Sequence, residues 1–182
     1  RELFVMALKA GDKAPLFAFT DHTGARRDLA DLAGRGKPAV LVFTRYAGCP
    51  ICRLETSRLG RNAAAFAAKG ATLLIVAQSS PANLGPLVEL APGAVLVSDP
   101  AGDSYRLYDV RPGNLLQYAA PAVLARAKEA AAAGFAHGPR EGEERQLPAS
   151  FVIGPDGTIL WARYARNIAD AASPEELLAK LP

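Results

Sequence analysis

Apolar runs and helical patterns alternate along most of the chain. Continuous apolar runs at residues 39–43, 71–77 and 94–97 are typical of strands that are buried on both faces of a sheet. Patterns with helical spacing follow these runs and recur later, at residues 51–66, 81–90, 101–108 and 121–133. Alternation of buried strands with helices predicts an α/β domain with a central mixed β-sheet flanked by helices on both faces.

The two ends of the pattern consist of hairpins and a final helix. Residues 15–21 and 26–29 predict one hairpin. Residues 150–153 and 158–164 predict a second hairpin around Gly154-Pro155-Asp156-Gly157, where proline fixes φ and glycine permits a positive φ. Ser173-Pro174-Glu175-Glu176 is a capping box that opens a helix ending at Lys180. Residues 138–146 are charged and aperiodic, which predicts a surface loop or a mobile flap.

Length and composition fit one globular domain. The chain has 182 residues, of which 50% are hydrophobic and 21% charged. We expect residues 11–182 to form this domain, with residues 114–146 as a helical and loop insertion before the last hairpin. Residues 1–10 are expected to be an N-terminal tail or a cloning remnant.

Charge and hydropathy exclude two classes of partner. The net charge of +3 is mild and its basic residues are scattered, so nucleic-acid binding has no support. The apolar stretch at residues 3–8 is shorter than a signal-peptide core or the ~20 residues of a membrane span. We therefore expect a cytoplasmic protein without a membrane contact.

The only two cysteines form the motif Cys49-Pro50-Ile51-Cys52. A bridge across two residues closes too small a loop to stabilise a secreted scaffold. A zinc site is not expected either, because His22 and His137 are distant from the pair and from each other in the sequence. The pair is therefore predicted to be present for its reactivity and to hold no metal.

The position of the pair assigns different roles to the two thiols. Cys49 falls at the first turn of a helix, where unpaired N–H groups and the helix dipole favour the thiolate, and Arg45 and Arg53 supply nearby positive charge. Cys49 is therefore the predicted nucleophile, and Cys52, one turn later and less exposed, is the predicted resolving thiol. The alternative, that both cysteines only pack beneath the helix, stays open.

Two groups of residues resemble a known family. A Cys-Pro-x-Cys motif after a buried strand, with Pro148 before a later strand, resembles the thioredoxin superfamily, in which this proline is cis and faces the cysteines. Gly11-Asp12-Lys13-Ala14-Pro15 and the following hairpin are similar to the start of the alkyl hydroperoxide reductase/thiol-specific antioxidant (peroxiredoxin-like) group. The resemblance implies a thioredoxin-like fold, an antioxidant role in cell redox homeostasis and a redox-active Cys49–Cys52 disulfide. It also implies that no cofactor is needed and that an external thioredoxin-like dithiol is the reductant.

The sequence also departs from that family. Typical peroxiredoxins resemble P-x-x-x-T-x-x-C, but Val42 stands at the position of the proline and Tyr46 at that of the threonine. The distant arginine of the family falls at about Pro148. We expect support for the thiols from Thr44, Arg45, Tyr46, Arg53 and Pro148. A strand at residues 158–164 that runs parallel to residues 39–43 could also bring Tyr164, Arg166 and Asn167 to the site, but a solvated strand end is the favoured alternative.

The sequence leaves the substrate open. The overall resemblance favours a hydroperoxide, whereas Pro148 and the missing threonine favour a protein disulfide. A non-enzymatic thioredoxin-fold binding module and a redox sensor are the remaining alternatives. The protein is expected to be a monomer or a homodimer.

Overall fold

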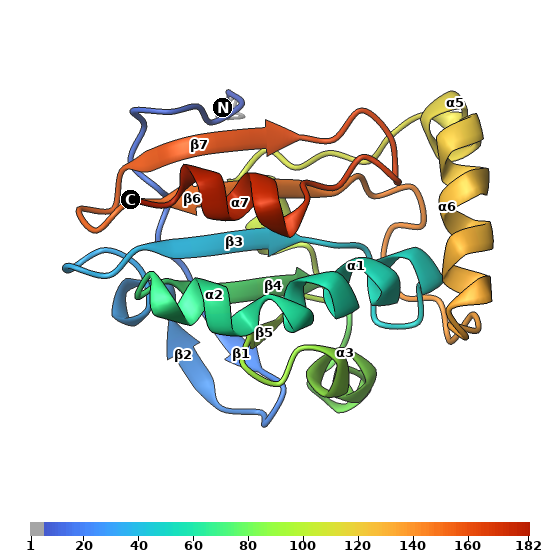
Figure 1. Ribbon diagram of the computed structural model, residues 1–182, viewed down its shortest axis with the longest axis horizontal. Helices are drawn as coiled ribbons and strands as arrows, with labels where there is room; N and C mark the ends of the chain where they lie inside the picture. Colours follow the sequence, from blue (N-terminus) through green and yellow to red (C-terminus); the bar gives the residue numbers. More distant parts are fainter. Residues whose placement is uncertain (1–5) are drawn as a thin grey trace.

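A seven-stranded mixed sheet forms the centre of the protein (Figure 1). The computed structural model describes residues 6–182, so the expectation for residues 1–5 lies outside the described residues. The strand order is β2-β1-β5-β4-β3-β6-β7. The strands are β1 (Ala18–Asp21), β2 (Arg26–Asp28), β3 (Ala39–Phe43), β4 (Thr72–Ala77), β5 (Val95–Ser98), β6 (Ala149–Ile153) and β7 (Ile159–Tyr164). This is the mixed sheet flanked by helices that the sequence pattern predicts, and it agrees with the thioredoxin-like fold that the resemblance implies.

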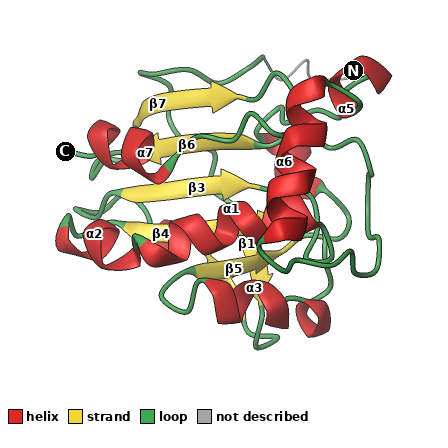
Figure 2. Cartoon of the chain, turned by 45° about the vertical axis from the view of Figure 1, so that its right-hand side comes forward, coloured by secondary structure: helices red, strands yellow, loops and turns green. Residues whose placement is uncertain are grey.

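Helices cover both faces of the sheet and one of its ends. They are α1 (Pro50–Arg61), α2 (Ala63–Ala68), α3 (Gly85–Leu90), α4 (Asp103–Leu107), α5 (Leu115–Tyr118), α6 (Pro121–Ala132) and α7 (Pro174–Lys180). In Figure 1, α1, α2 and α7 lie in front of the sheet, and α6 stands across the end toward which β3 and β7 point. Figure 2 shows α6 crossing close to the start of α1.

The alternation of side chains along β3 builds two cores. Leu41 and Phe43 point into the core shared with Tyr105, on the side of α4. Val40 and Val42 point to the other face, where α1, α2, α3 and α7 pack. All five residues of β3 are buried, as is typical of a central strand. Their apolar side chains pack on both faces of the sheet, so β3 gives a fixed starting position to the loop at residues 44–49.

The strand directions bring several chain segments to the same end of the sheet, where β3 and its parallel neighbours have their C-terminal ends. β3 is parallel to β4 and antiparallel to β6, and β6 is antiparallel to β7. β7 therefore runs parallel to β3, as the sequence analysis assumed. The segments that leave the C-terminal ends of β3, β4, β5 and β7 meet at this end, which is the usual place for ligand sites in sheets of this kind.

Two predicted helices are broken in the structure. The pattern at residues 51–66 forms α1 and α2, because Asn62 turns its side-chain amide to the carbonyl oxygen of Arg58 at 2.9 Å and competes with the helical backbone. The pattern at residues 81–90 forms a 3₁₀ turn (Pro81–Asn83) and then α3, since Pro86 stands in the first turn of α3 and prolines favour the start of a helix. The capping box at Ser173 has both expected hydrogen bonds.

Residues 138–146 are more tightly integrated than the expected surface loop or flap. The Gln78 side chain accepts a bond from the Glu143 N–H at 2.9 Å and donates one to the Glu143 carbonyl at 3.2 Å. The buried Gln146 amide donates to the Val110 carbonyl at 3.0 Å. An aperiodic, charged segment therefore has a defined path because the side-chain amides of Gln78 and Gln146 hydrogen-bond it to the rest of the domain.

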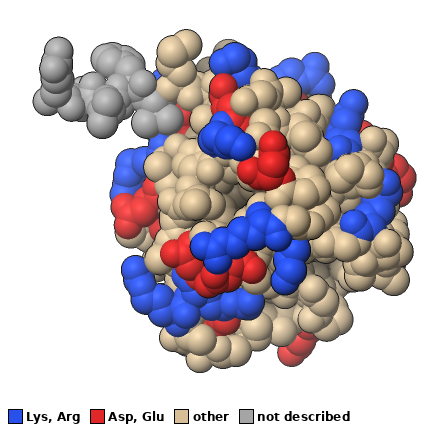
Figure 3. Space-filling model, turned by 90° about the vertical axis from the view of Figure 1, so that its left-hand side faces the viewer, with Lys and Arg blue, Asp and Glu red and all other residues tan. Residues whose placement is uncertain are grey.

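The charged surface is mixed. On the face shown in Figure 3, lysine and arginine side chains lie among aspartates and glutamates. Within residues 6–182, no helix has the length and apolar character required to cross a bilayer.

Tyr105 hydrogen-bonds the backbone at the C-terminal ends of β3 and β4. Its hydroxyl donates to the Thr44 carbonyl at 2.8 Å, and the Val76 carbonyl lies 3.1 Å away. We expect Tyr105→Phe to destabilise the domain by about 1–2 kcal/mol in urea unfolding, because it leaves a buried carbonyl unsatisfied. Tyr108→Phe, which removes a bond to the Pro15 carbonyl, is the control. Both should cost stability, and only Tyr105→Phe should alter the reactivity of the cysteines; equal reactivity in the two variants would contradict this assignment.

Candidate active site

Cys49 stands at the junction between β3 and α1, as the sequence predicts. The connecting turn is fixed by its neighbours: the Thr44 N–H and hydroxyl both donate to the Val76 carbonyl at 2.9 Å, and the Ala47 N–H donates to the Ser79 hydroxyl at 2.9 Å. Cys49 is the N-cap of α1, with Pro50 as the first helical residue. The sulfur of Cys49 is therefore held at the positive end of a helix by the geometry of the strand that precedes it.

Two donors point at the Cys49 sulfur. The Arg45 Nη2 atom is 3.1 Å from Cys49 Sγ, and the Cys52 N–H donates to the same sulfur at 3.2 Å. Burial of Cys49 raises its pKa, but the hydrogen bonds from Cys52 and the charge of Arg45 outweigh burial and lower the pKa below the ordinary thiol value. Cys49 is thus a thiolate near neutral pH, the reactive form of the residue.

Arg45 is itself held in place on several sides. Its side chain is only 7% exposed, and Nη1 donates to the Glu144 carbonyl at 2.6 Å. The guanidinium carbon lies 5.2 Å from the ring centre of Tyr46 and 5.8 Å from that of Tyr118, within the range of cation–π interactions. A buried cation with these contacts can hold a fixed position against the sulfur.

Cys52 differs from Cys49 in its chemical state. It is also buried, one turn further into α1. Burial raises the pKa of Cys52 well above the ordinary value, and its hydrogen bond to Cys49 and the charge there raise it further. The geometry gives one thiolate and one neutral thiol, which are the states that the nucleophile and the resolving thiol require. The catalytic roles of the two cysteines stay predictions.

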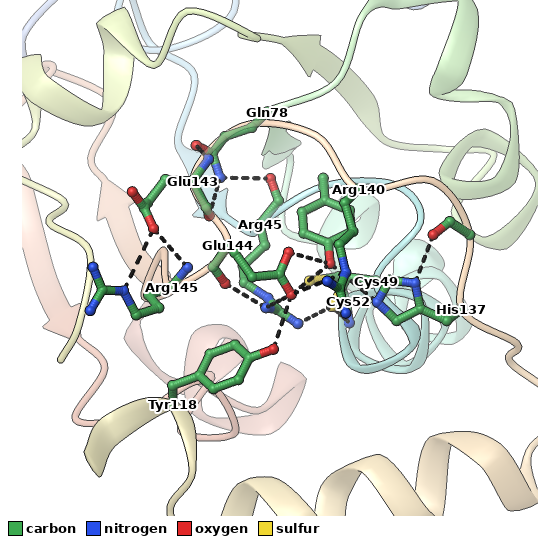
Figure 4. A network of polar contacts seen from close by, with 12 residues as sticks. Arg45, Cys49, Cys52, Gln78, Tyr118, His137, Arg140, Glu143, Glu144 and Arg145 are labelled. Atoms are coloured by element: carbon green, nitrogen blue, oxygen red, sulfur yellow. Dashed lines mark hydrogen bonds and ion pairs between the residues drawn. The ribbon is translucent and has the colours of Figure 1, made fainter. Parts of the chain in front are cut away.

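A carboxylate that no sequence motif marked contacts the side chains around this pair (Figure 4). Glu144 Oε1 is 3.3 Å from Arg45 Nη1, and the hydroxyl of Tyr46 is 2.9 Å from Glu144 Oε2. The Tyr118 hydroxyl donates to Glu144 Oε1 at 3.1 Å, and His137 Nε2 lies 3.3 Å from the Tyr46 hydroxyl. Burial and the hydrogen bond to Glu144 raise the pKa of Tyr46, so its phenol stays neutral. Glu144 lies in the aperiodic segment at residues 138–146, and Tyr118 and His137 lie elsewhere in the expected insertion at residues 114–146, where no motif marked a site residue.

The segment that carries Glu144 touches the cysteine loop through its backbone. The Gly138 N–H donates to the Gly48 carbonyl at 2.8 Å. A Cβ atom on Gly48 would lie 2.2 Å from the Pro139 carbonyl oxygen, so only glycine permits this approach. We call residues 136–146 the cover segment. It contacts one side of the cysteine loop, while Val123, Ile168 and Ala169 pack in the same cluster as Cys49, whose relative exposure is 0%.

Arg53 supports the site without touching the sulfur. Its Nε donates to the Ala47 carbonyl at 2.7 Å, and Nη1 donates to the Ala136 carbonyl at 3.1 Å. The side chain therefore links the cysteine loop to the start of the cover segment. The charge next to Cys49 comes from Arg45 instead.

Pro148 lies near Cys52 but is not a cis residue. No peptide bond in residues 6–182 is cis, so the expectation of a cis Pro148 is wrong. Pro148 precedes the first residue of β6, where no ladder N–H is needed, and a trans proline is compatible with a strand start. It lines a narrow crevice together with Cys52 and Thr44, whose hydroxyl is directed at Val76 rather than at the sulfurs.

Three further candidates lie elsewhere. The Tyr164 hydroxyl donates to the Tyr108 carbonyl at 2.8 Å, Arg166 pairs with Asp170, and Asn167 caps a turn through Ala169. The direction of β7 was predicted correctly, and the segment after it reaches the site, but not through these three side chains. Ile168 and Ala169 pack into the cluster that contains Cys49 in place of these polar residues.

Metal ligation has no structural basis in the described part of the chain. Among residues 6–182, no three side chains of histidine, cysteine, aspartate or glutamate are grouped as a metal site requires.

Comparison with known proteins identifies a family and its fold. The model of the AhpC/TSA family matches residues 10–162. No curated protein matches the chain significantly. Among solved structures, peroxidoxin BcpB from Mycobacterium tuberculosis is 24% identical with a TM-score of 0.69, and the match covers 96% of each chain.

Two other solved structures show the range of similar proteins. A putative thiol:disulfide interchange protein DsbE from Chlorobium tepidum is 22% identical with a TM-score of 0.62, covering 97% of this chain and 100% of the other. AhpC from Enterococcus faecalis is 17% identical with a TM-score of 0.68, covering 97% of this chain and 91% of the other. At these identities the similarity establishes the fold.

The contact between Arg45 and Cys49 generates a test by pH titration. Arg45→Gln removes the charge that favours the thiolate, so the midpoint of alkylation of Cys49 should move to higher pH by about 1–3 units. In the wild type the pKa of Cys49 lies below that of an ordinary thiol, so Cys49 stays a reactive thiolate at neutral pH. Its reactivity is lost as the pH falls through the pKa of Cys49. Arg53→Gln is the matched control and should leave the midpoint in place. Equal midpoints for all three proteins would show that Arg45 does not set the thiolate state.

Proposed function

The chain belongs to the AhpC/TSA family of thiol-dependent oxidoreductases, and from this premise we propose that it reduces small hydroperoxides through Cys49. The observation that carries the proposal is the Cys49 sulfur, completely buried and hydrogen-bonded by a fixed arginine at 3.1 Å. Such a sulfur combines an activated thiolate with a site that favours small oxidants over large ones.

The cover segment supports the choice of a small oxidant. In the proposed reaction a hydroperoxide reaches Cys49 through motions of side chains around Arg45, such as that of Glu144, which break side-chain contacts alone. A disulfide of a folded protein needs the backbone of the cover segment to move. That motion breaks the bond from Gly138 to Gly48 and the bonds between Glu143 and Gln78. The first motion is the smaller, since each buried backbone group left without a partner is costly.

The first chemical step oxidises Cys49. The thiolate attacks the terminal oxygen of the hydroperoxide, the S–O bond forms, and the O–O bond breaks. The alkoxide leaves and takes a proton from solvent to become an alcohol, or water when the substrate is hydrogen peroxide. Arg45 faces the reacting sulfur and offers N–H groups to the oxygen on which charge develops.

The second step forms the disulfide. Cys52 attacks the sulfur of the Cys49 sulfenic acid, the S–O bond breaks, and water leaves. An external dithiol of the thioredoxin kind then reduces the Cys49–Cys52 disulfide and becomes a disulfide itself. Both electrons pass through sulfur, so the cycle requires no cofactor. This cycle fits an antioxidant role in cell redox homeostasis.

Protein-disulfide exchange is the second candidate. The pair Cys49-Pro50-Ile51-Cys52 at a helix start, with Pro148 lining the crevice next to Cys52, favours it. In that reaction Cys49 attacks a partner disulfide, the partner leaves as a thiolate, and Cys52 resolves the mixed disulfide.

Rapid kinetics of the reduced protein separate the two candidates. We expect the wild type to react with hydrogen peroxide at least about 100-fold faster than a free cysteine thiol. A hydrogen-bond donor fixed against the developing charge, as Arg45 is here, raises reaction rates by about that factor. Cys49→Ser should abolish the reaction. Cys52→Ser should keep the first step and accumulate a sulfenic acid that a dimedone probe detects. A rate equal to that of a free thiol, together with fast insulin reduction, would favour disulfide exchange instead.

Gly48 provides a test of the cover segment. Gly48→Ala places a methyl group against the Pro139 carbonyl, and overpacking costs about 1–3 kcal/mol, so the open state should become about 5- to 150-fold more populated. Alkylation of Cys49 by a bulky maleimide and reduction of insulin should both accelerate. Gly85→Ala is the control, because its added methyl meets nothing within 4 Å. Unchanged alkylation in Gly48→Ala would contradict a selective role of the cover.

A further inference from the structure

Three side chains that the proposed cycle does not yet use link the protein surface to Arg45. His137 Nε2 lies 3.3 Å from the Tyr46 hydroxyl, and this hydroxyl is 2.9 Å from Glu144 Oε2. The other carboxylate oxygen, Glu144 Oε1, is 3.3 Å from Arg45 Nη1. His137 is exposed, whereas Tyr46 is fully buried. The chain of contacts therefore runs from solvent to the guanidinium that faces the Cys49 sulfur.

The partners of these groups indicate where their protons lie. The Gly138 carbonyl, 2.7 Å from His137 Nδ1, only accepts hydrogen bonds, so Nδ1 carries a proton. The Tyr46 hydroxyl has one proton and donates it to Glu144, its closest partner. The hydroxyl oxygen can then only accept from His137 Nε2. Both ring nitrogens of His137 thus face acceptors, and an imidazolium satisfies every contact in the chain.

Glu144 has the surroundings of an ionised carboxylate (Figure 4). The hydroxyls of Tyr46 and Tyr118 donate to it, and the Arg45 guanidinium faces it. Among the described residues, the partners of its two oxygens are donors and none is an acceptor. A carboxylate in this state holds no proton of its own and can accept one. Glu144 can therefore pass on a proton that reaches it from Tyr46.

The proposed reduction of a hydroperoxide requires a proton beside Arg45. When the O–O bond breaks, the leaving oxygen carries the negative charge of an alkoxide. Arg45 stabilises this charge but keeps its own protons. The side chains that pair with the Arg45 N–H groups are Cys49, which is the attacking thiolate, and Glu144. Glu144 is therefore the group through which a proton can reach the leaving oxygen.

We propose that His137 is the proton donor for the leaving oxygen and that Tyr46 and Glu144 carry the proton to it. This inference deepens the proposed reduction of hydroperoxides and rests on it. Histidine suits the task because it gains and loses a proton near neutral pH and is a far stronger acid than water. Glu144 meets the leaving oxygen and is the catalytic acid, whereas Tyr46 and His137 act through it as positioning and relay residues.

The protons and electrons balance in one step. The Cys49 thiolate attacks the terminal oxygen of the hydroperoxide, the S–O bond forms, and the electron pair of the O–O bond goes to the leaving oxygen. The Nε2 proton of His137 moves to the Tyr46 hydroxyl as the hydroxyl proton moves to Glu144, and Glu144 gives a proton to the leaving oxygen. One thiolate, one hydroperoxide and one imidazolium become one sulfenic acid, one alcohol and one imidazole. The exposed His137 then regains its proton from solvent.

The test compares two oxidants of similar size by rapid kinetics of the reduced protein. Ethyl hydroperoxide releases ethoxide, a strong base that needs a proton. Peracetic acid releases acetate, a weak base that leaves without one. The ratio of the two rate constants of Cys49 oxidation therefore measures how strongly the site assists the departure of a poor leaving group.

His137→Gln and Tyr46→Phe interrupt the chain at different links. Glutamine can still hydrogen-bond the Tyr46 hydroxyl but cannot carry the proton, and phenylalanine keeps the ring that lies 5.2 Å from the Arg45 guanidinium. In each variant the rate constant with peracetic acid, divided by that with ethyl hydroperoxide, should rise about 100-fold, which is the scale of general acid catalysis. Because His137 is exposed, His137→Gln decides the question if Tyr46→Phe does not fold.

Tyr118→Phe is the matched control. It removes a hydroxyl that donates to the same carboxylate at 3.1 Å, but this hydroxyl does not stand between His137 and Glu144. An effect of Tyr118 on Arg45 or Glu144 changes the reactions with both oxidants alike. The variant should therefore keep the wild-type ratio of the two rate constants.

The outcomes separate the relay from the proposed function. Equal slowing with both oxidants in His137→Gln overturns the relay, because a purely structural role affects both reactions alike, and so does an unchanged rate with ethyl hydroperoxide. A ratio that rises in Tyr118→Phe as much as in Tyr46→Phe overturns it as well. If the wild type reacts with ethyl hydroperoxide no faster than a free thiol does, the proposed hydroperoxide reduction itself fails and the relay fails with it.

Discussion

The contact between the Arg45 guanidinium and the Cys49 sulfur is the interaction on which this structure depends. A thiolate that is completely buried is unfavourable unless a cation and N–H donors compensate it. Arg45 provides this compensation only because it is held by the rings of Tyr46 and Tyr118 and by the carbonyl of Glu144. The packing of these groups around one side chain is therefore part of the chemistry of the sulfur.

The same arginine couples the reactive sulfur to the cover segment. One Nη atom of Arg45 bonds the sulfur and the other bonds the backbone of Glu144. Arg45 therefore joins the sulfur and the cover segment directly, and a change in the charge of Cys49 would act on both of these hydrogen bonds.

The sequence was sufficient to predict the local elements and the thiol pair, and insufficient for long-range contacts. The strand at residues 39–43 and the capping box at Ser173 are encoded by neighbouring residues, and both were predicted correctly. The cover was missed because Glu144 acts through contacts with residues about a hundred positions earlier. The prediction of a cis Pro148 was wrong because it was taken from a family resemblance and not from the neighbouring residues. A strand start accommodates a trans proline.

The approach of Gly138 to Gly48 has a consequence for the variability of this site. It is a contact between two backbones, so this anchor of the cover segment does not depend on the side chains that the segment carries. The far end of the segment differs, because it is anchored through the side-chain amide of Gln146. One end of the cover segment therefore tolerates any side chain that leaves the backbone in place, whereas the other end is tied to the identity of a single residue.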